Sequence, residues 1–132
     1  MKSKIPNSLP KQSLGDVMDK LTTLTRKVYF GEEDAIEEMN YLIDSLDRID
    51  IKKHTPRLGK FLVTIIRLAQ INFEVWNLEN AFRRGVDMSG NRVKEIALNV
   101  RELNRKRVHY KNEINKLTKL GFREFKIKHL SQ

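Results

Sequence analysis

Two segments with a helical apolar pattern decide the fold: residues 58–83 read LGKFLVTIIRLAQINFEVWNLENAFR, and residues 91–120 read NRVKEIALNVRELNRKRVHYKNEINKLTKL. In both segments apolar residues recur at spacings of three and four, which places them on one face of an α-helix. The stretch between the segments contains Gly85 and Gly90 and breaks this pattern. The sequence therefore predicts two long helices that turn back on each other as an antiparallel hairpin.

Two shorter helices are expected before the hairpin. The first opens at Ser13, whose hydroxyl can cap the free amide of Asp16, and it closes at Gly31, because glycine takes the left-handed closing conformation cheaply. The second begins near Glu32 with acidic residues in its first turns and ends before Pro56, which suits the first position of the next helix. The predicted fold is all-α, a four-helix bundle-like domain with a long antiparallel C-terminal helical hairpin.

The predicted domain organisation has three parts. Residues 1–12 form a flexible N-terminal arm, because this stretch holds two of the three prolines and no apolar periodicity. Residues 13–121 form the helical bundle domain, and residues 122–132 form an extended C-terminal tail. The last helix is a rod of about 30 residues and roughly 45 Å, so it overhangs the shorter helices. The apolar face of the overhanging part must be buried against another surface. A second copy of the chain is the simplest candidate, so we expect a homodimer.

The composition is that of a single soluble helical domain: 132 residues, of which 39% are hydrophobic and 33% charged. No run approaches the roughly 18 apolar residues of a membrane span. The N-terminus lacks the apolar stretch of a signal peptide. The chain has no cysteine, which excludes disulfides and thiolate metal sites. We therefore expect a cytoplasmic protein without a membrane span.

The net charge of +9 is unevenly distributed along the chain. Residues 1–66 hold 11 Lys and Arg against 10 Asp and Glu, whereas residues 67–132 hold 15 against 7. The net charges of the two halves are thus +1 and +8. A basic half favours an anionic small molecule or an acidic protein as partner, and a solvated basic helix surface is the alternative interpretation.

Polar residues interrupt the apolar faces of the hairpin at matching depth. On the first helix, four of them share a face: Asn72, Trp76, Glu79 and Arg83. On the second helix, the interrupting residues are Asn104, Arg107 and Lys111. Because the two helices are antiparallel neighbours, the two sets are expected to meet. A buried carboxylate needs a partner, so Glu79 is expected to pair with Arg107 or Arg83.

Two interpretations of these polar residues remain open. The first is a satisfied network that fixes the register of the hairpin. The second is an anion or sugar-phosphate pocket, in which Arg83, Arg107 and Lys111 donate hydrogen bonds and Trp76 is a stacking wall. An open cleft over Glu79 and Arg107 would favour a ligand or an enzyme, whereas a dry, fully paired cluster would favour a structural role.

The sequence nominates no catalytic residue, no metal site and no cofactor. The acidic stretch Glu32–Glu38 resembles the helix carboxylates of magnesium-binding pyrophosphatases, but those enzymes need a second acidic pair, and no Glu-x-x-Asp follows this stretch. A solvated helix start, in which these acids are favoured by the helix dipole, is therefore the preferred interpretation. The three histidines are dispersed, and no glycine-rich phosphate loop or nucleophile-elbow serine occurs.

A basic run from Arg101 to Lys128 makes nucleic-acid binding an alternative function. Such binding uses one basic face together with aromatic residues for stacking. Tyr110 is the only Phe, Tyr or Trp of the last helix, and its spacing places it on the apolar face. Glu102 and Glu113 also interrupt the charge.

Short segments over most of the chain carry one further signal: Leu14-Gly15-Asp16; Asp19-Lys20-Leu21-Thr22; Asn72, Trp76, Glu79 and Arg83; Asn104, Arg107, Lys111, Ile114 and Asn115; and Gly121, Glu124 and Lys126. Together they resemble a group of small helical proteins of uncharacterised function that occur beside glycosyltransferases in bacterial surface-polysaccharide gene sets. The resemblance implies a helical architecture and a link to saccharides, and it supplies no reaction.

The hypothesis from the sequence is a non-catalytic helical binding or accessory module, linked through the resemblance to saccharide or nucleotide-sugar metabolism. The alternatives are an enzyme acting on a nucleotide-sugar or another phosphate-bearing small molecule, and a nucleic-acid-binding protein that uses the basic C-terminal half. The ligand-binding candidates are Asp19, Lys20, Asn72, Trp76, Glu79, Arg83, Asn104, Arg107 and Lys111.

Overall fold

A computed structural model of the chain describes residues 11–83, 89–120 and 124–126. These residues form five helices and two short strands in the order β1 (Lys11–Ser13), α1 (Leu14–Tyr29), α2 (Glu33–Asp47), α3 (Ile51–His54), α4 (Leu58–Arg83), α5 (Gly90–Leu117) and β2 (Glu124–Lys126). The predicted all-α fold and the long C-terminal hairpin are therefore confirmed.

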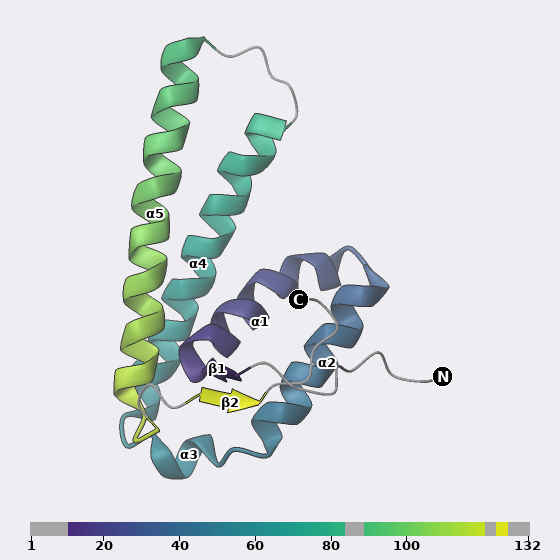
Figure 1. Cartoon of the computed structure of the whole chain (residues 1–132), viewed down its shortest axis with the longest axis vertical. Coiled ribbons are helices and arrows are strands. Elements are labelled where there is room, and N and C mark those ends of the chain that lie inside the picture. The colour runs from purple at the N-terminus through teal and green to yellow at the C-terminus, as the bar shows by residue number, and fades with distance from the viewer. Residues whose placement is uncertain (1–10, 84–88, 121–123, 127–132) are drawn as a thin grey trace.

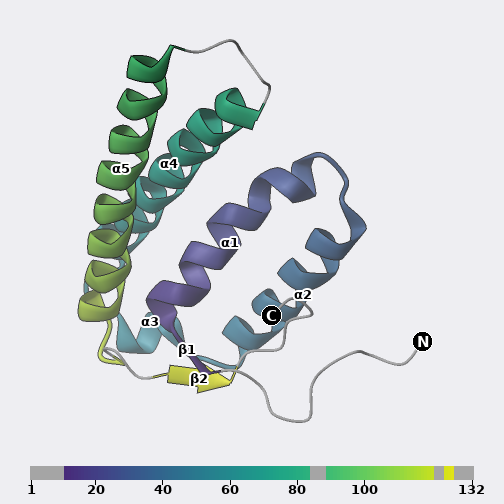
Figure 2. The same ribbon diagram turned by 45° about the horizontal axis from the view of Figure 1, so that its top comes forward.

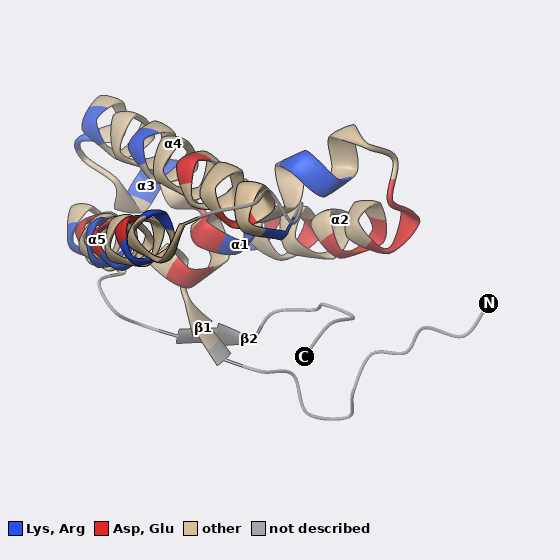
Figure 3. Ribbon diagram, turned by 90° about the horizontal axis from the view of Figure 1, so that it is seen from above, with Lys and Arg blue, Asp and Glu red and all other residues tan. Residues whose placement is uncertain are grey.

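The α4–α5 hairpin is the tallest part of the molecule and rises above the shorter helices (Figure 1). α1 packs against both hairpin helices, and α2 packs on the other side of α1. Figure 2 shows α1 inclined between the hairpin and α2. Seen from above, the two strands lie on one side of the helices and α4 lies on the opposite side (Figure 3). The lower half of the hairpin is thus covered by α1, while its upper half projects.

Apolar side chains from α1 join the elements through two clusters. Leu14 and Met18 pack with Phe61, Leu68 and Ile114, which ties α1 to the base of the hairpin. On the opposite side of α1, the buried cluster consists of Val17, Leu24, Ala35 and Leu42, which ties α1 to α2. A third cluster, of Ile71, Val75 and Leu103, holds α4 against α5 higher in the hairpin. Two opposite faces of α1 are therefore buried in the core.

Local capping chemistry sets several helix ends. The Ser13 hydroxyl accepts a hydrogen bond from the Asp16 amide at 3.2 Å, as the sequence predicts. Gly31 has a φ of 77° just after α1, in the region that glycine adopts without strain. Ser89 caps α5 by accepting from the amide of Arg92. Gly85, which breaks the apolar pattern after the first long segment, and Gly121 lie outside the described residues.

Between the end of α2 and Pro56 the structure has a short helix, α3, that the apolar pattern does not reveal. The Asp50 carboxylate accepts from the amide of Lys53 and so caps α3. One turn of helix is too short to show a periodic signal, which is why the pattern missed it.

The two strands pair antiparallel, with Lys11 opposite Lys126 and Ser13 opposite Glu124. The pairing brings the residues just before α1 together with the segment that follows α5. Lys11 and Gln12, which the sequence analysis assigned to a flexible arm, therefore have a partner strand. None of the helices in the described ranges combines the length and apolar character that a membrane-spanning segment needs.

Candidate functional site

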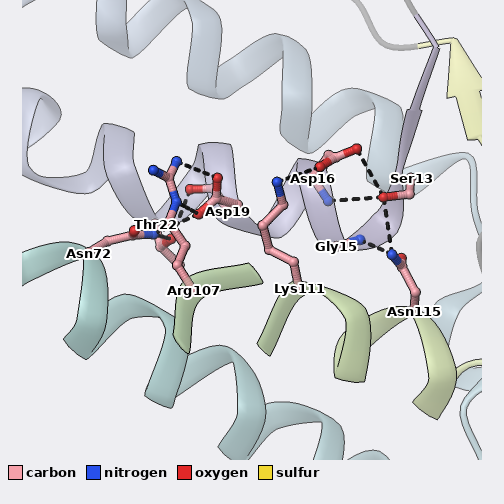
Figure 4. A network of polar contacts seen from close by, with 9 residues as sticks. All are labelled: Ser13, Gly15, Asp16, Asp19, Thr22, Asn72, Arg107, Lys111 and Asn115. Carbon is pink, nitrogen blue, oxygen red and sulfur yellow. Dashed lines mark hydrogen bonds and ion pairs between the residues drawn. The ribbon is translucent and has the colours of Figure 1, made fainter. Parts of the chain in front are cut away.

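The central polar contact joins three helices through one carboxylate. Arg107 on α5 donates to both carboxylate oxygens of Asp19 on α1, from Nε at 2.8 Å and from Nη2 at 2.6 Å (Figure 4). The Nδ2 group of Asn72 on α4 donates to Asp19 at 2.9 Å and to the Thr22 hydroxyl at 2.8 Å. We call Asp19, Thr22, Asn72 and Arg107 the Asp19 network.

Burial makes this contact strong and costly to break. The side chain of Asp19 is 8% exposed and that of Arg107 is 34% exposed. The hydrogen bond to Asp19 raises the pKa of Arg107, because it outweighs the opposing effect of burial, and the negative charges of Asp19 and Glu79 act in the same direction. A bidentate Arg–carboxylate contact fixes orientation as well as distance. The Asp19 network therefore fixes how α1 sits on the hairpin.

A second polar group lies nearer the start of α1. Lys111 on α5 forms an ion pair with Asp16 at 2.7 Å. Asn115 accepts a hydrogen bond from the Gly15 amide at 2.8 Å and donates to Ser13 at 3.2 Å. Partial burial raises the pKa of Asp16, but the bond and charge of Lys111 and the bonds with Ser13 lower it more, so the net direction is downward. Figure 4 shows this group and the Asp19 network side by side along α1.

A cleft of about 800 Å³ opens beside the Asp19 network, between the second half of α1 and α4. Thr22, Asn72 and Arg107 belong to both the network and the cleft wall. The other polar and charged lining residues are Thr23, Thr25, Arg26, Lys27, Glu79 and Arg83, and the rings are those of Tyr29, Phe30, Phe73 and Trp76. A volume of this size is typical of small-molecule sites.

The cleft wall is rich in cations. The cleft is lined by four cationic side chains and by one carboxylate, that of Glu79. The four cations are Arg26, Lys27, Arg83 and Arg107. The Arg26 guanidinium lies over the ring of Trp76 and 5.7 Å from the ring centre of Phe30. Loss of solvent contact and the positive charge of Arg83 lower the pKa of Arg26, against the opposite effect of Glu32. Arg26 and Arg83 therefore repel each other across the cleft. An anion bound between them would neutralise this repulsion.

The structure does not bring all predicted site residues to one place. Lys20 lies on the other side of α1 from the hairpin and pairs with Glu38 of α2 at 3.3 Å. Asn104 is exposed on α5 and lines none of the described pockets. Glu79 pairs with Arg83, one of its two expected partners, at 3.2 Å. However, its side chain is 45% exposed, so the expected burial of Glu79 is wrong.

Sequence reasoning missed the part of the cleft that α1 supplies. Arg26, Tyr29 and Phe30 close α1, and their only signal was a pair of aromatic residues next to a helix end. Tyr29 and Phe30 are 82% and 68% exposed, which is unusual for side chains of this size. The helical pattern identifies residues that face the core, so it gives no reason to single out residues that face a cleft.

A separate hollow of about 530 Å³ lies between α4 and α5, away from α1. Its lining includes the basic residues Arg67, Arg105 and Lys106 together with His109 and Tyr110. Glu74 is its only carboxylate. Within the described residues, no group of three or more His, Asp or Glu side chains could hold a metal ion, and this includes the acidic first turns of α2.

Comparisons with protein-family models, curated proteins and solved structures gave no match to this chain.

Proposed function

We propose that the protein is a non-catalytic binding module whose cleft between α1 and α4 takes up an anionic small molecule with a flat ring, of which a nucleotide-sugar is the expected class. The observation that carries the proposal is the combination of four cations and four aromatic rings around one open cleft. The arginine side chains can donate paired hydrogen bonds to phosphate groups, and the aromatic rings can stack on a nucleotide base. We also propose a cytoplasmic location, in keeping with a cysteine-free sequence.

The contacts that the polar residues already make support binding rather than catalysis. Asp19 is occupied by Arg107 and Asn72, so the buried carboxylate of the site is not free to act as a base. Glu79 is half-exposed and paired with Arg83. Arg107 uses two of its five N–H groups on Asp19 and still lines the cleft. The cleft thus offers hydrogen-bond donors and ring faces to a ligand that already carries the negative charge.

Titration with UDP-glucose is expected to change the fluorescence of Trp76, the only tryptophan of the chain. A bound anion draws Arg26 away from the ring of Trp76, which alters the surroundings of the indole. Arg26→Gln removes one charge-assisted contact and should weaken binding roughly tenfold. Isothermal titration calorimetry gives the dissociation constant independently, with UDP and glucose as separate ligands to locate the recognised part.

Lys94→Gln is the matched control, because it removes the same charge from an exposed residue of α5 that lines none of the described pockets. It should bind as the wild type does. The proposal fails if the wild type shows no saturable binding of UDP-glucose or UDP, or if Arg26→Gln and Lys94→Gln weaken binding equally.

The hollow between α4 and α5 supports nucleic-acid binding as a second candidate. Arg67, Arg105 and Lys106 are close enough together to line one space, and Tyr110 adds a ring. A single-stranded RNA should then bind with a log affinity that falls with log salt by about 0.7 for each phosphate contacted. Fluorescence anisotropy measures this slope, and Lys106→Gln should make it shallower. A slope that Lys106→Gln and Lys94→Gln change equally would rule out the hollow as the contact site.

A further inference from the structure

The inner end of the cleft between α1 and α4 is formed by side chains of the Asp19 network. Asn72 is 8% exposed there, and its Nδ2 group donates to both Asp19 and Thr22. A carboxylate can only accept hydrogen bonds, so the contact with Asp19 fixes which end of the Asn72 amide faces it. The Oδ1 atom of Asn72 therefore faces away from Asp19, as an acceptor that the network does not use.

This oxygen atom is open to the cleft. No described residue donates a hydrogen bond to Oδ1 of Asn72. Among the fully enclosed side-chain oxygen and nitrogen atoms of the described residues, only the Thr55 hydroxyl lacks a partner, so Oδ1 of Asn72 is not fully enclosed. The cleft is the one described pocket that Asn72 lines. Arg107 adds a donor to the same wall, because its Nε and Nη2 atoms contact Asp19 while no described residue accepts from Nη1.

The inner end of the cleft favours a neutral group that can donate hydrogen bonds. The charge of Arg107 is already balanced there by the carboxylate of Asp19. Three threonines of α1 also line the cleft, and each gives its hydroxyl proton to a carbonyl oxygen about one turn back: Thr22, Thr23 and Thr25. These hydroxyls can therefore only accept from a ligand. The phosphates of a nucleotide-sugar carry acceptors and no donor, so they do not match this wall.

The positive charge that a ligand can use lies farther out along the cleft. Arg26 and Lys27 line it and form no ion pair with any described residue. Arg83 follows Asn72 by 11 positions on α4, which is roughly 16 Å along the helix. α1 and α4 move apart toward their carboxyl ends, where these cations lie (Figures 1 and 2). The cleft thus has a neutral inner end and a cationic outer end.

We propose that the inner end of the cleft is a sugar subsite in which Asn72 is the specificity-determining residue. The inference rests on the proposed function and gives its ligand one orientation. A sugar hydroxyl donates to Oδ1 of Asn72, and Nη1 of Arg107 donates to the oxygen of a neighbouring hydroxyl. The phosphates then lie among Arg26, Lys27 and Arg83, and the base reaches the exposed rings at the end of α1. A sugar hydroxyl both donates and accepts, which is what an acceptor beside a donor selects.

The test compares UDP-glucose with UDP by isothermal titration calorimetry on the full chain. The wild type should bind UDP-glucose roughly tenfold more tightly than UDP, because the sugar adds two hydrogen bonds. Asn72→Leu should bind UDP as the wild type does and should bind UDP-glucose no more tightly than UDP. Arg26→Gln should weaken both ligands by the same factor, because it changes only the phosphate end.

Asn104→Leu is the matched control, because Asn104 is exposed on α5 and lines none of the described pockets. It should keep the wild-type preference for UDP-glucose. Asn72 also supports Asp19, so a second measurement uses the wild type alone. In heteronuclear NMR spectra the side-chain amide signals of Asn72 should shift when UDP-glucose is added and stay in place when UDP is added.

Three results would overturn the sugar subsite. Equal affinity of the wild type for UDP-glucose and UDP removes the subsite and leaves the anion site of the proposed function in place. Equal weakening of both ligands in a folded Asn72→Leu variant, or equal shifts of the Asn72 amide signals with both ligands, places the base or the phosphates at the inner end instead. Absence of binding of either ligand removes the proposed function and the subsite together.

Discussion

Replacing Arg107 by methionine is expected to lower the free energy of unfolding by about 3 kcal/mol, measured by urea denaturation. The change leaves the carboxylate of Asp19, which is 8% exposed, with only the amide of Asn72 as a partner on the hairpin. Breaking a buried ion pair from one side is costly, because the remaining charge keeps its desolvation penalty. The value is placed at the lower end of the usual range, since Arg107 is itself one-third exposed and water can reach the gap.

Two further variants separate the ion pair from a general effect of charge. Glu79→Gln breaks the solvated Glu79–Arg83 pair and should change stability by less than about 0.5 kcal/mol. Asp19→Leu combined with Arg107→Met removes both charges and should recover most of the loss of Arg107→Met, because apolar side chains often replace a buried pair without penalty. If Glu79→Gln is as destabilising as Arg107→Met, the Asp19 network is not what holds α1 to the hairpin.

The helices and their caps could be predicted from the sequence because both are local properties. The apolar spacing of α4 and α5, the Ser13 cap and the left-handed Gly31 all depend on residues a few positions apart. What the sequence leaves open is which helix faces meet. α4 shows this best, because two of its faces are apolar, and nothing in the sequence says which of them packs inside the chain.

The sequence does not show which helix faces meet, and this also explains why the predicted and observed polar contacts differ. The polar set was expected to centre on Glu79, because it shares a helix face with Asn72 and could be paired within the hairpin. The buried carboxylate is instead Asp19, which α1 brings to Arg107 over 88 positions of sequence. Asp19 entered the candidate set only through the resemblance. A contact between distant segments depends on how the helices are packed, and spacing along one helix carries no information about that packing.

Gly15→Ala is expected to destabilise the protein by about 3 kcal/mol or to prevent it from folding at ambient temperature. Gly15 sits at the start of α1, where the backbone of α1 touches the backbone of α5. An added Cβ would overlap the carbonyl oxygen of Lys111 and lie 3.0 Å from the Nδ2 atom of Asn115. A side chain could rotate away, but the carbonyl group of a packed helix cannot. Relief requires the two helices to separate, which also breaks the bond between the Gly15 amide and Asn115.

Gly90→Ala is the control for this prediction, because an added Cβ at Gly90 has no neighbour within 4 Å and the residue also begins a helix. It should change stability by less than about 0.5 kcal/mol. If Gly15→Ala does not fold, Asn115→Leu keeps Gly15 and removes only the side chain that binds its amide. This variant should lose about 1–3 kcal/mol, since the Gly15 amide is then buried without an acceptor. Wild-type stability in Gly15→Ala would mean that α1 does not approach α5 as closely as the Gly15–Lys111 contact requires.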